Sequence, residues 1–94
     1  MQLKKIWKMT QKEKLLARLC SLPNDFTINQ LKRLMKSLGY IEYQRGKTSG
    51  SRIAFYHPEK KLVLNLHKPH PSNELKIYQI KEIIKFLKRT GELK

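Results

Sequence analysis

The spacing of the apolar residues changes twice along this chain, and the two changes restrict the folds open to it. Apolar side chains recur three and four residues apart from Ile28 to Leu38. Large apolar side chains then recur at every second position in two runs, Ile53 and Phe55 and then Leu62, Leu64 and Leu66, and the helical spacing returns towards Leu87. Because helices repeat every 3.6 residues and strands every two, the pattern predicts helices on both sides of a group of strands.

Three helices are predicted from their apolar stripes and from the residues that begin or end a helix. Thr27 and Gln30 have the spacing of a capping box, and Gly39 stands where a C-terminal glycine cap belongs. The first helix ends before Pro23, and Cys20 is expected on its apolar stripe in the core. The predicted helices cover 11–21, 28–38 and 74–89.

Three strands are predicted between the second and third helices, with a turn over 58–61 that joins the last two. A four-residue turn there sets Phe55 opposite Leu64 and Arg52 opposite His67. A shift of one residue would set leucines opposite polar side chains, so the apolar pattern constrains this register. The predicted strands cover 40–45, 51–57 and 62–67.

Antiparallel strands that each have one apolar face need helices on that face alone. The expected fold is therefore α+β, with a three-stranded antiparallel sheet and helices packed on one side of it, in the order helix–helix–strand–strand–strand–helix. The other face of the sheet is expected to be open and to carry polar and basic side chains. Residues 1–11 are expected to form a basic lead-in and 12–94 a single domain, because no linker or repeat divides them.

The charge of the chain points to a polyanionic partner. Among 94 residues, 21 are Lys or Arg and 7 are Asp or Glu, which gives a formal net charge of +14. Such an excess repels itself unless a polyanion or an acidic protein lies beside it, and nucleic acid gains counterion release on binding. A merely solvated, lysine-rich surface is the alternative. No segment has the length and apolarity of a membrane helix or of an export signal, so a cytoplasmic protein is expected.

The predicted register gathers polar and basic side chains around Arg52 and His67 on the open face. Imidazoles transfer protons near neutral pH and cations stabilise phosphate charge, so the cluster suits phosphodiester chemistry. We assign catalysis to Arg52, His67 and His70; the alternative is that both histidines are merely exposed beside a phosphate-binding lysine. The side chains assigned to nucleic-acid binding are Arg45, Lys47, Asn65, Lys68 and Lys76.

Metal and cofactor chemistry are not expected at this cluster. No third ligand of Asp, Glu, His or Cys type is close in sequence to His67 and His70. The seven acidic residues are scattered, which is untypical of nucleases that hold metals with carboxylates. The single cysteine, Cys20, cannot form an internal disulfide framework.

Two other features bear on contacts with nucleic acid. The segment 46–50, with Lys47 between two glycines, either presents backbone N–H groups and an ammonium to a phosphate or is a plain hairpin loop. The tyrosines are not expected to form a stacking platform on the sheet, so base stacking is expected to contribute weakly. They are Tyr40, Tyr43, Tyr56 and Tyr78.

Three spaced motifs occur in order between about Thr27 and Leu93. They are Phe26-Thr27 with Leu31, Leu34 and Leu38-Gly39-Tyr40, then Gly50-Ser51-Arg52-Ile53-Ala54-Phe55, then His70 with Glu74-Leu75-Lys76 and 79–83. In this order and spacing the chain resembles the HicA family of bacterial toxin mRNA interferases. The resemblance implies a double-stranded-RNA-binding-domain-like (dsRBD-like) fold, here with an extra leading helix. It also implies a type II toxin that cleaves mRNA and is neutralised by a HicB-like antitoxin.

The resemblance also bears on the catalytic residue. The family usually has its catalytic histidine at the start of the second strand, where this chain has Arg52. We therefore expect His67, opposite Arg52, to supply the imidazole, assisted by His70 at a position where the family often has a second histidine. A non-catalytic RNA-binding module of the same fold is the alternative. A protein that acts only through a protein partner is a third reading.

Overall fold

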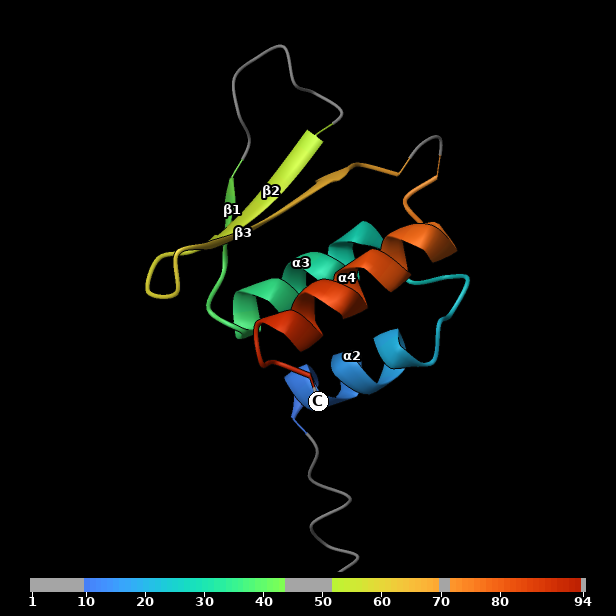
Figure 1. Cartoon of the computed structure of the whole chain (residues 1–94). Coiled ribbons are helices and arrows are strands. Elements are labelled where there is room, and N and C mark those ends of the chain that lie inside the picture. Colours follow the sequence, from blue (N-terminus) through green and yellow to red (C-terminus); the bar gives the residue numbers. More distant parts are fainter. Residues whose placement is uncertain (1–9, 44–51, 70–71, 94) are drawn as a thin grey trace, which may run out of the picture.

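The computed structural model describes residues 10–43, 52–69 and 72–93. Its α+β architecture and its order of helices and strands are those expected from the sequence (Figure 1). The predicted lead-in up to residue 9, the ends of two predicted strands at residues 44, 45 and 51, and the glycine-flanked segment 46–50 lie outside the described residues. The elements are α2 (Gln11–Cys20), α3 (Ile28–Ser37), β1 (Ile41–Tyr43), β2 (Arg52–His57), β3 (Leu62–His67) and α4 (Ile77–Arg89).

The three strands form one antiparallel sheet in the order β1-β2-β3. The predicted register of β2 and β3 is confirmed, with Phe55 opposite Leu64 and Arg52 opposite His67. In β1, Tyr43 pairs with Ala54. Residues on one face of a strand are two apart, so this register decides which side chains share the open face.

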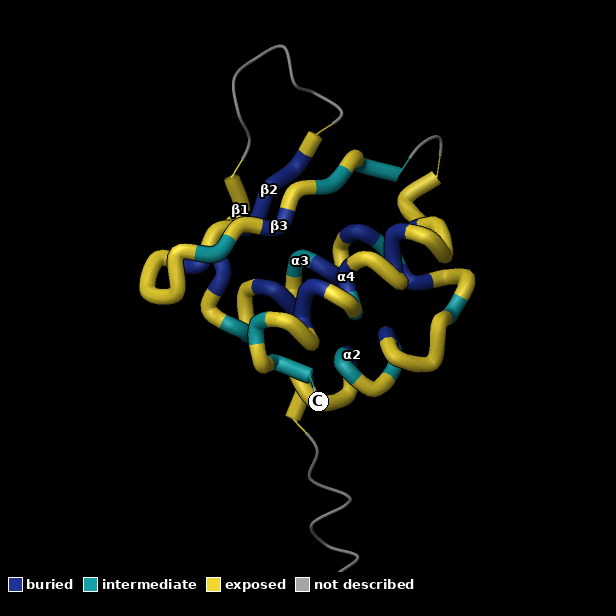
Figure 2. The backbone as a smooth tube through the Cα atoms, viewed as in Figure 1, coloured by how far each residue is buried: buried dark blue, intermediate teal, exposed yellow. Residues whose placement is uncertain are grey.

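The molecule has three layers, namely the sheet, the pair α3 and α4, and then α2 (Figure 1). Helices α3 and α4 cover one face of the sheet, and α2 packs against them on their other side. The buried segments lie mainly on β2, α3 and α4 (Figure 2). The largest fully buried side chains are Phe26, Phe55, Leu19, Leu31, Leu34, Met35, Ile53, Ile80, Ile83 and Leu87.

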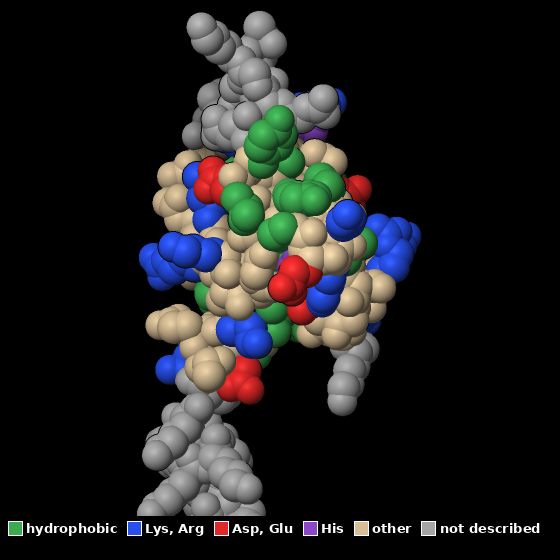
Figure 3. Space-filling model, turned by 90° about the vertical axis from the view of Figure 1, so that its left-hand side faces the viewer, with side chains coloured by type: hydrophobic (Ala, Val, Ile, Leu, Met, Phe, Trp, Pro, Cys, Tyr) green, Lys and Arg blue, Asp and Glu red, His purple; other side chains and the backbone are tan. Residues whose placement is uncertain are grey.

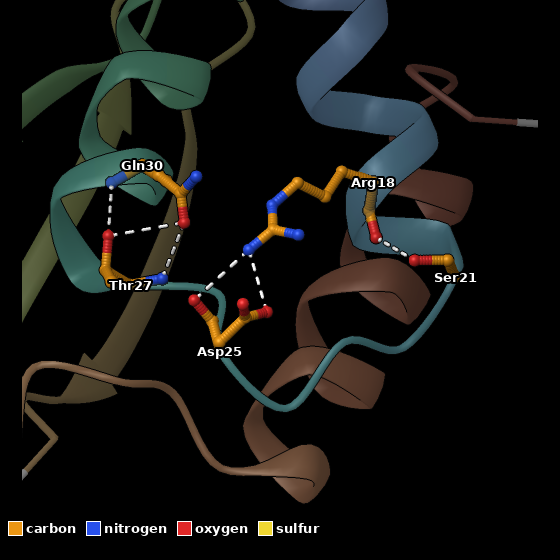
Figure 4. Close-up of polar contacts among 5 residues, drawn as sticks. All are labelled: Arg18, Ser21, Asp25, Thr27 and Gln30. Carbon is orange, nitrogen blue, oxygen red and sulfur yellow. Dashed lines mark hydrogen bonds and ion pairs between the residues drawn. The ribbon is translucent and has the colours of Figure 1, made fainter.

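Both ends of α3 have the predicted caps. The Gln30 N–H donates to Thr27 Oγ1 at 3.2 Å, and the Thr27 N–H donates to Gln30 Oε1 at 2.9 Å (Figure 4). Gly39 follows the helix with a φ of +95°, a conformation that side chains other than glycine's disfavour. A Cβ at this position would also lie 2.9 Å from Nε2 of His57. Glycine is therefore required here for two separate reasons.

Helix α2 is fixed by contacts that the sequence analysis did not identify. Thr10 and Glu13 form a capping box, with the Glu13 N–H donating to Thr10 Oγ1 and the Thr10 N–H to Glu13 Oε1. Its signal was the Thr-x-x-Glu spacing. At the other end, Arg18 donates to the Asp25 carboxylate at 2.8 Å (Figure 4). The Arg18 guanidinium also lies 5.7 Å from the centre of the Phe26 ring. Arg18 thus ties α2 to the segment that begins α3.

The prediction that Cys20 belongs to the core is wrong, because its side chain is exposed. Leu15 and Leu19 are the buried side chains of α2 and lie one helical turn apart. Successive helical residues are turned by roughly 100°, which directs Cys20 away from the stripe that Leu15 and Leu19 form.

The predicted start of the last helix at Glu74 is also wrong, since α4 begins at Ile77. The Leu75 N–H donates to Phe26 O and the Ile28 N–H to Asn73 O, both at 2.8 Å. These bonds hold the segment in an extended bridge beside the start of α3, where it cannot be helical. Leu75 is buried as expected, but from this bridge.

Candidate functional site

Arg52 and His67 lie opposite each other at one end of the hairpin of β2 and β3. Both side chains are exposed. Directly opposite residues on one face of an antiparallel pair have Cβ atoms about 4.5–5.5 Å apart. The guanidinium and the imidazole therefore extend from neighbouring positions, as the sequence register predicts.

An open hollow of about 670 Å³ surrounds this pair. Ala54, one of its lining residues, lies between Tyr43 on β1 and Asn65 on β3 in the register of the sheet. Ala54 itself is only 4% exposed. The described residues that line the hollow are Tyr43, Arg52, Ile53, Ala54, Asn65, Leu66 and His67.

A buried glutamine holds the backbone at His67. The Gln79 Nε2 donates to His67 O at 2.8 Å, and Gln79 Oε1 accepts from the Lys76 N–H at 3.0 Å. Only 4% of Gln79 is exposed. One side chain therefore joins the start of α4 to the end of β3 and fixes the main chain beside the imidazole.

No role could be assigned to Gln79 from the sequence. Its available signal was a polar side chain next to the inward-facing Ile80 on an amphipathic helix. Buried polar groups need hydrogen-bond partners, and such a glutamine is expected to reach a neighbouring element. Which element it reaches depends on the packing of α4 against β3.

The structure brings together part of the predicted site. Arg52, Asn65 and His67 line one hollow, and Lys68 follows His67 directly. Lys76 is the N-cap of α4, so Gln79 connects its backbone to that of His67. The remaining assigned side chains lie outside the described residues; they are Arg45, Lys47 and His70.

The open face is only partly polar. The predicted polar and basic character holds at the Arg52–His67 end and is wrong at the other end, where Tyr56 and Val63 are exposed together with Ile41. Figure 3 shows hydrophobic side chains gathered on this face, with Lys and Arg around them. Tyr43 lies between the two ends, on the strand next to Tyr56, and both tyrosines are exposed.

Acidic side chains lie away from the described part of the open face. No open-face position in the described strand residues carries a carboxylate. Glu42 of β1 points to the helical side, where it forms an ion pair of 3.3 Å with Lys32 of α3. A guanidinium, an imidazole and an amide without a competing carboxylate form a suitable arrangement for holding a phosphate and transferring a proton.

Within 10–43, 52–69 and 72–93, no group of three or more His, Cys, Asp or Glu side chains is placed to hold a metal ion. None of the helices in this part of the chain has both the length and the apolar character needed to span a bilayer.

Comparison with protein families gives one match. The family model described as HicA toxin of bacterial toxin-antitoxin matches residues 28–91, which extend from the start of α3 to just beyond α4. Helix α2 precedes the matched region, in agreement with an extra leading helix. No curated protein and no solved structure matches the chain. With α3, all three strands and α4 inside the match, the chain belongs to the HicA family of toxins from bacterial toxin-antitoxin systems.

Proposed function

We propose that this HicA-family toxin is an endoribonuclease that cleaves mRNA without a metal ion, and that Arg52 and His67 form the centre of its active site. One observation carries the proposal. The two side chains are paired across β2 and β3, both are exposed, and both line the same hollow. A cation and a proton-transferring group at adjacent positions are what cleavage beside a ribose requires.

In the proposed reaction, the imidazole of His67 or His70 takes the proton of a ribose 2′-hydroxyl. The 2′-oxygen attacks the adjacent phosphorus, and the bond from phosphorus to the 5′-oxygen breaks. The products are a 2′,3′-cyclic phosphate and a 5′-hydroxyl, whose oxygen receives a proton from the other imidazole or from water. Arg52 stabilises the charge on the non-bridging oxygens of the phosphorane.

The remaining assigned residues hold the RNA backbone around the reacting phosphate. Asn65 supplies an amide within the hollow, and the basic side chains supply charge that binding RNA neutralises. The basic residues in this role are Arg45, Lys47, Lys68 and Lys76. No cofactor takes part.

Within this pair the base is His67, because arginine is permanently charged in proteins and cannot accept a proton. Arg52 stands where the family usually has its catalytic histidine, so the imidazole has moved to the opposite strand. The pairing of Arg52 with His67 keeps the cation and the imidazole at neighbouring positions.

The test is cleavage of an unmodified RNA in the presence of EDTA. The wild type is expected to cleave, and His67→Ala, or the double variant with His70→Ala, is expected to lose about 10²–10⁴-fold in rate. Binding of a 2′-O-methylated RNA, which lacks the nucleophile, serves as the control that the variants remain folded and bind. Unchanged cleavage in the double variant would contradict the assignment, and loss of wild-type cleavage in EDTA would contradict metal independence.

We further propose that the toxin acts in the cytoplasm and that a HicB-like antitoxin neutralises it. Expression in a bacterium should arrest growth, the His67→Ala/His70→Ala variant should not, and co-expression of a HicB-type antitoxin should restore growth. Growth arrest by the double variant would show that toxicity does not depend on these two imidazoles. Tight binding of an acidic protein with negligible salt-dependent RNA binding would instead indicate a toxin that acts through a protein partner.

A second candidate function is a non-catalytic RNA-binding module of the same fold. The observation that favours it is Arg52 at the family's usual catalytic position. Basic side chains suffice to bind A-form RNA through its phosphates and shape. RNA binding without cleavage at any pH between about 5 and 8, the range in which histidine changes charge, would support the module over the enzyme.

A further inference from the structure

A second hollow continues the first across the open face of the sheet. It has a volume of about 540 Å³, and it shares Tyr43, Ala54 and Asn65 with the hollow around Arg52 and His67. Its other lining residues are Ile41, Tyr56 and Val63. The polar end and the apolar end of this face therefore form one continuous surface.

Two tyrosines follow Arg52 along this surface. Tyr43 pairs with Ala54, so it lies diagonally between Arg52 on one side of Ala54 and Tyr56 on the other. Diagonal neighbours in a sheet are about 7–8 Å apart. Tyr43 is 55% exposed and Tyr56 36% exposed. Neither ring is paired with another aromatic ring among the residues that the structure describes.

The charge of the chain and of this face favours a polyanionic occupant. The chain has a net charge of +14, and the open-face positions of the described strands include Arg52 and His67 but no carboxylate. An aromatic surface that continues into a cationic one complements a molecule whose flat apolar bases are joined by phosphates.

We propose that Tyr43 and Tyr56 form a base-stacking subsite for unpaired nucleotides of an RNA whose phosphate lies at Arg52 and His67. The inference rests on the proposed function, because it takes that pair as the phosphate position. Bases in a duplex are stacked on one another and do not present their faces to a protein. The subsite therefore selects single-stranded segments, although dsRBD-like folds commonly recognise duplex RNA by shape.

The test compares Tyr43→Leu, Tyr56→Leu and the double variant with Tyr78→Leu. Tyr78 is a matched control, because it is a tyrosine on α4 that is 56% exposed. The single-stranded probe is a 2′-O-methylated oligouridylate of about ten nucleotides, which the toxin cannot cleave through the 2′-oxygen. The second probe is a duplex of about 16 base pairs, the length that a dsRBD spans.

The double variant is expected to bind the single strand about 10- to 100-fold more weakly than the wild type, since each stacked base contributes to affinity. Tyr78→Leu should bind like the wild type. Duplex affinity should be unchanged, and so should the dependence of single-strand binding on salt, because the phosphate contacts remain.

Equal single-strand affinity in the wild type and the double variant would overturn the subsite. An apolar surface used by a second copy of the chain would give a different result, namely a wild-type dimer in sedimentation that the double variant loses while its RNA affinity is unchanged. Cleavage of unmodified RNA is measured separately. A wild type that binds but does not cleave overturns the proposed function, while the binding comparison still decides the subsite.

Discussion

Two histidines lie at opposite ends of the hairpin of β2 and β3, and their surroundings differ in every respect. His57 is buried, its Nδ1 accepts the Lys60 N–H at 3.1 Å, and its ring packs edge-on to Tyr40 with 5.0 Å between centroids. His67 is exposed and lines an open hollow beside Arg52. One imidazole is therefore buried, with one ring nitrogen hydrogen-bonded and its ring packed against Tyr40, while the other is exposed at an open hollow.

The largest expected difference comes from replacing each histidine by alanine. His67→Ala should lower RNA cleavage by about 10²–10⁴-fold. Its free energy of unfolding should change by less than about 0.5 kcal/mol, because the side chain is exposed. His57→Ala should reduce stability by about 2 kcal/mol, through the lost acceptor and the lost packing.

Urea denaturation and cleavage of the folded fraction measure the two effects. If His57→Ala abolished cleavage while the protein remained folded, the separation of a structural and a catalytic histidine would fail.

The next effect concerns the glycine against which His57 packs. Gly39→Ala should destabilise the protein by about 2–3 kcal/mol, because it combines a positive φ with a Cβ 2.9 Å from His57 Nε2. Gly91→Ala is the matched control. Gly91 has a φ of +90° but nothing within 4 Å of an added Cβ, so a loss of about 1 kcal/mol is expected. Equal losses in thermal unfolding would show that the contact with His57 contributes nothing.

Gln79 of α4 bonds to the other end of the hairpin, and Gln79→Met should lower activity more than stability. Loss of the two hydrogen bonds is expected to cost about 1–2 kcal/mol of stability. Cleavage by the folded protein should fall by more than the loss of stability explains, because His67 O loses its hydrogen-bond donor. The main chain no longer fixes the position of the imidazole. A fall in the catalytic rate with unchanged affinity for 2′-O-methylated RNA is the expected signature. Cleavage that falls only in proportion to the unfolded fraction would give Gln79 a purely structural role.

The smallest effect is at the hydroxyl of Tyr40, the residue whose ring packs against His57. Tyr40 Oη is buried without a hydrogen-bond partner among the described residues, and the nearby Thr90 hydroxyl donates to Leu87 O instead. Burial raises the pKa of Tyr40 above its ordinary value of 10.0. The stability that depends on the neutral hydroxyl is therefore complete below pH 10.0 and is lost as the pH rises through the raised value in the folded protein.

Tyr40→Phe should accordingly stabilise the protein by about 1 kcal/mol at neutral pH, because it removes an unpaired buried polar group. It should also reduce the loss of stability above pH 10.0. Lys60, whose pKa is raised by its hydrogen bond to Glu92, adds to the alkaline loss in both proteins. An unchanged alkaline transition in urea titrations would argue against burial as the cause.

Much of the fold followed from local patterns. The Thr27–Gln30 box, Gly39 and the alternation in β2 and β3 act over a few residues, and each of them is visible in the sequence. The predicted start of α4 was wrong because this boundary depends on a bridge between Glu74 and Thr27, which lie far apart in the sequence. Propensity alone does not reveal such a pairing.

The candidate site divides in the same way. The pairing of Arg52 with His67 could be predicted from the turn over 58–61, since a short hairpin determines its own register. The position of Tyr43 beside Tyr56 was not predicted, because alternation within a strand as short as β1 does not give its register against β2. Its position depends on pairing with Ala54, eleven residues later in the sequence.

The amide of Gln79 has a consequence for motion as well as for structure. Its carbonyl oxygen holds the N–H of Lys76 and its nitrogen holds the carbonyl of His67, so the two backbone groups are released together. When the first turn of α4 frays, the hydrogen bond from Gln79 to the end of β3 is therefore lost as well. Hydrogen exchange at the Lys76 amide should then report how often the end of β3 that carries His67 loosens.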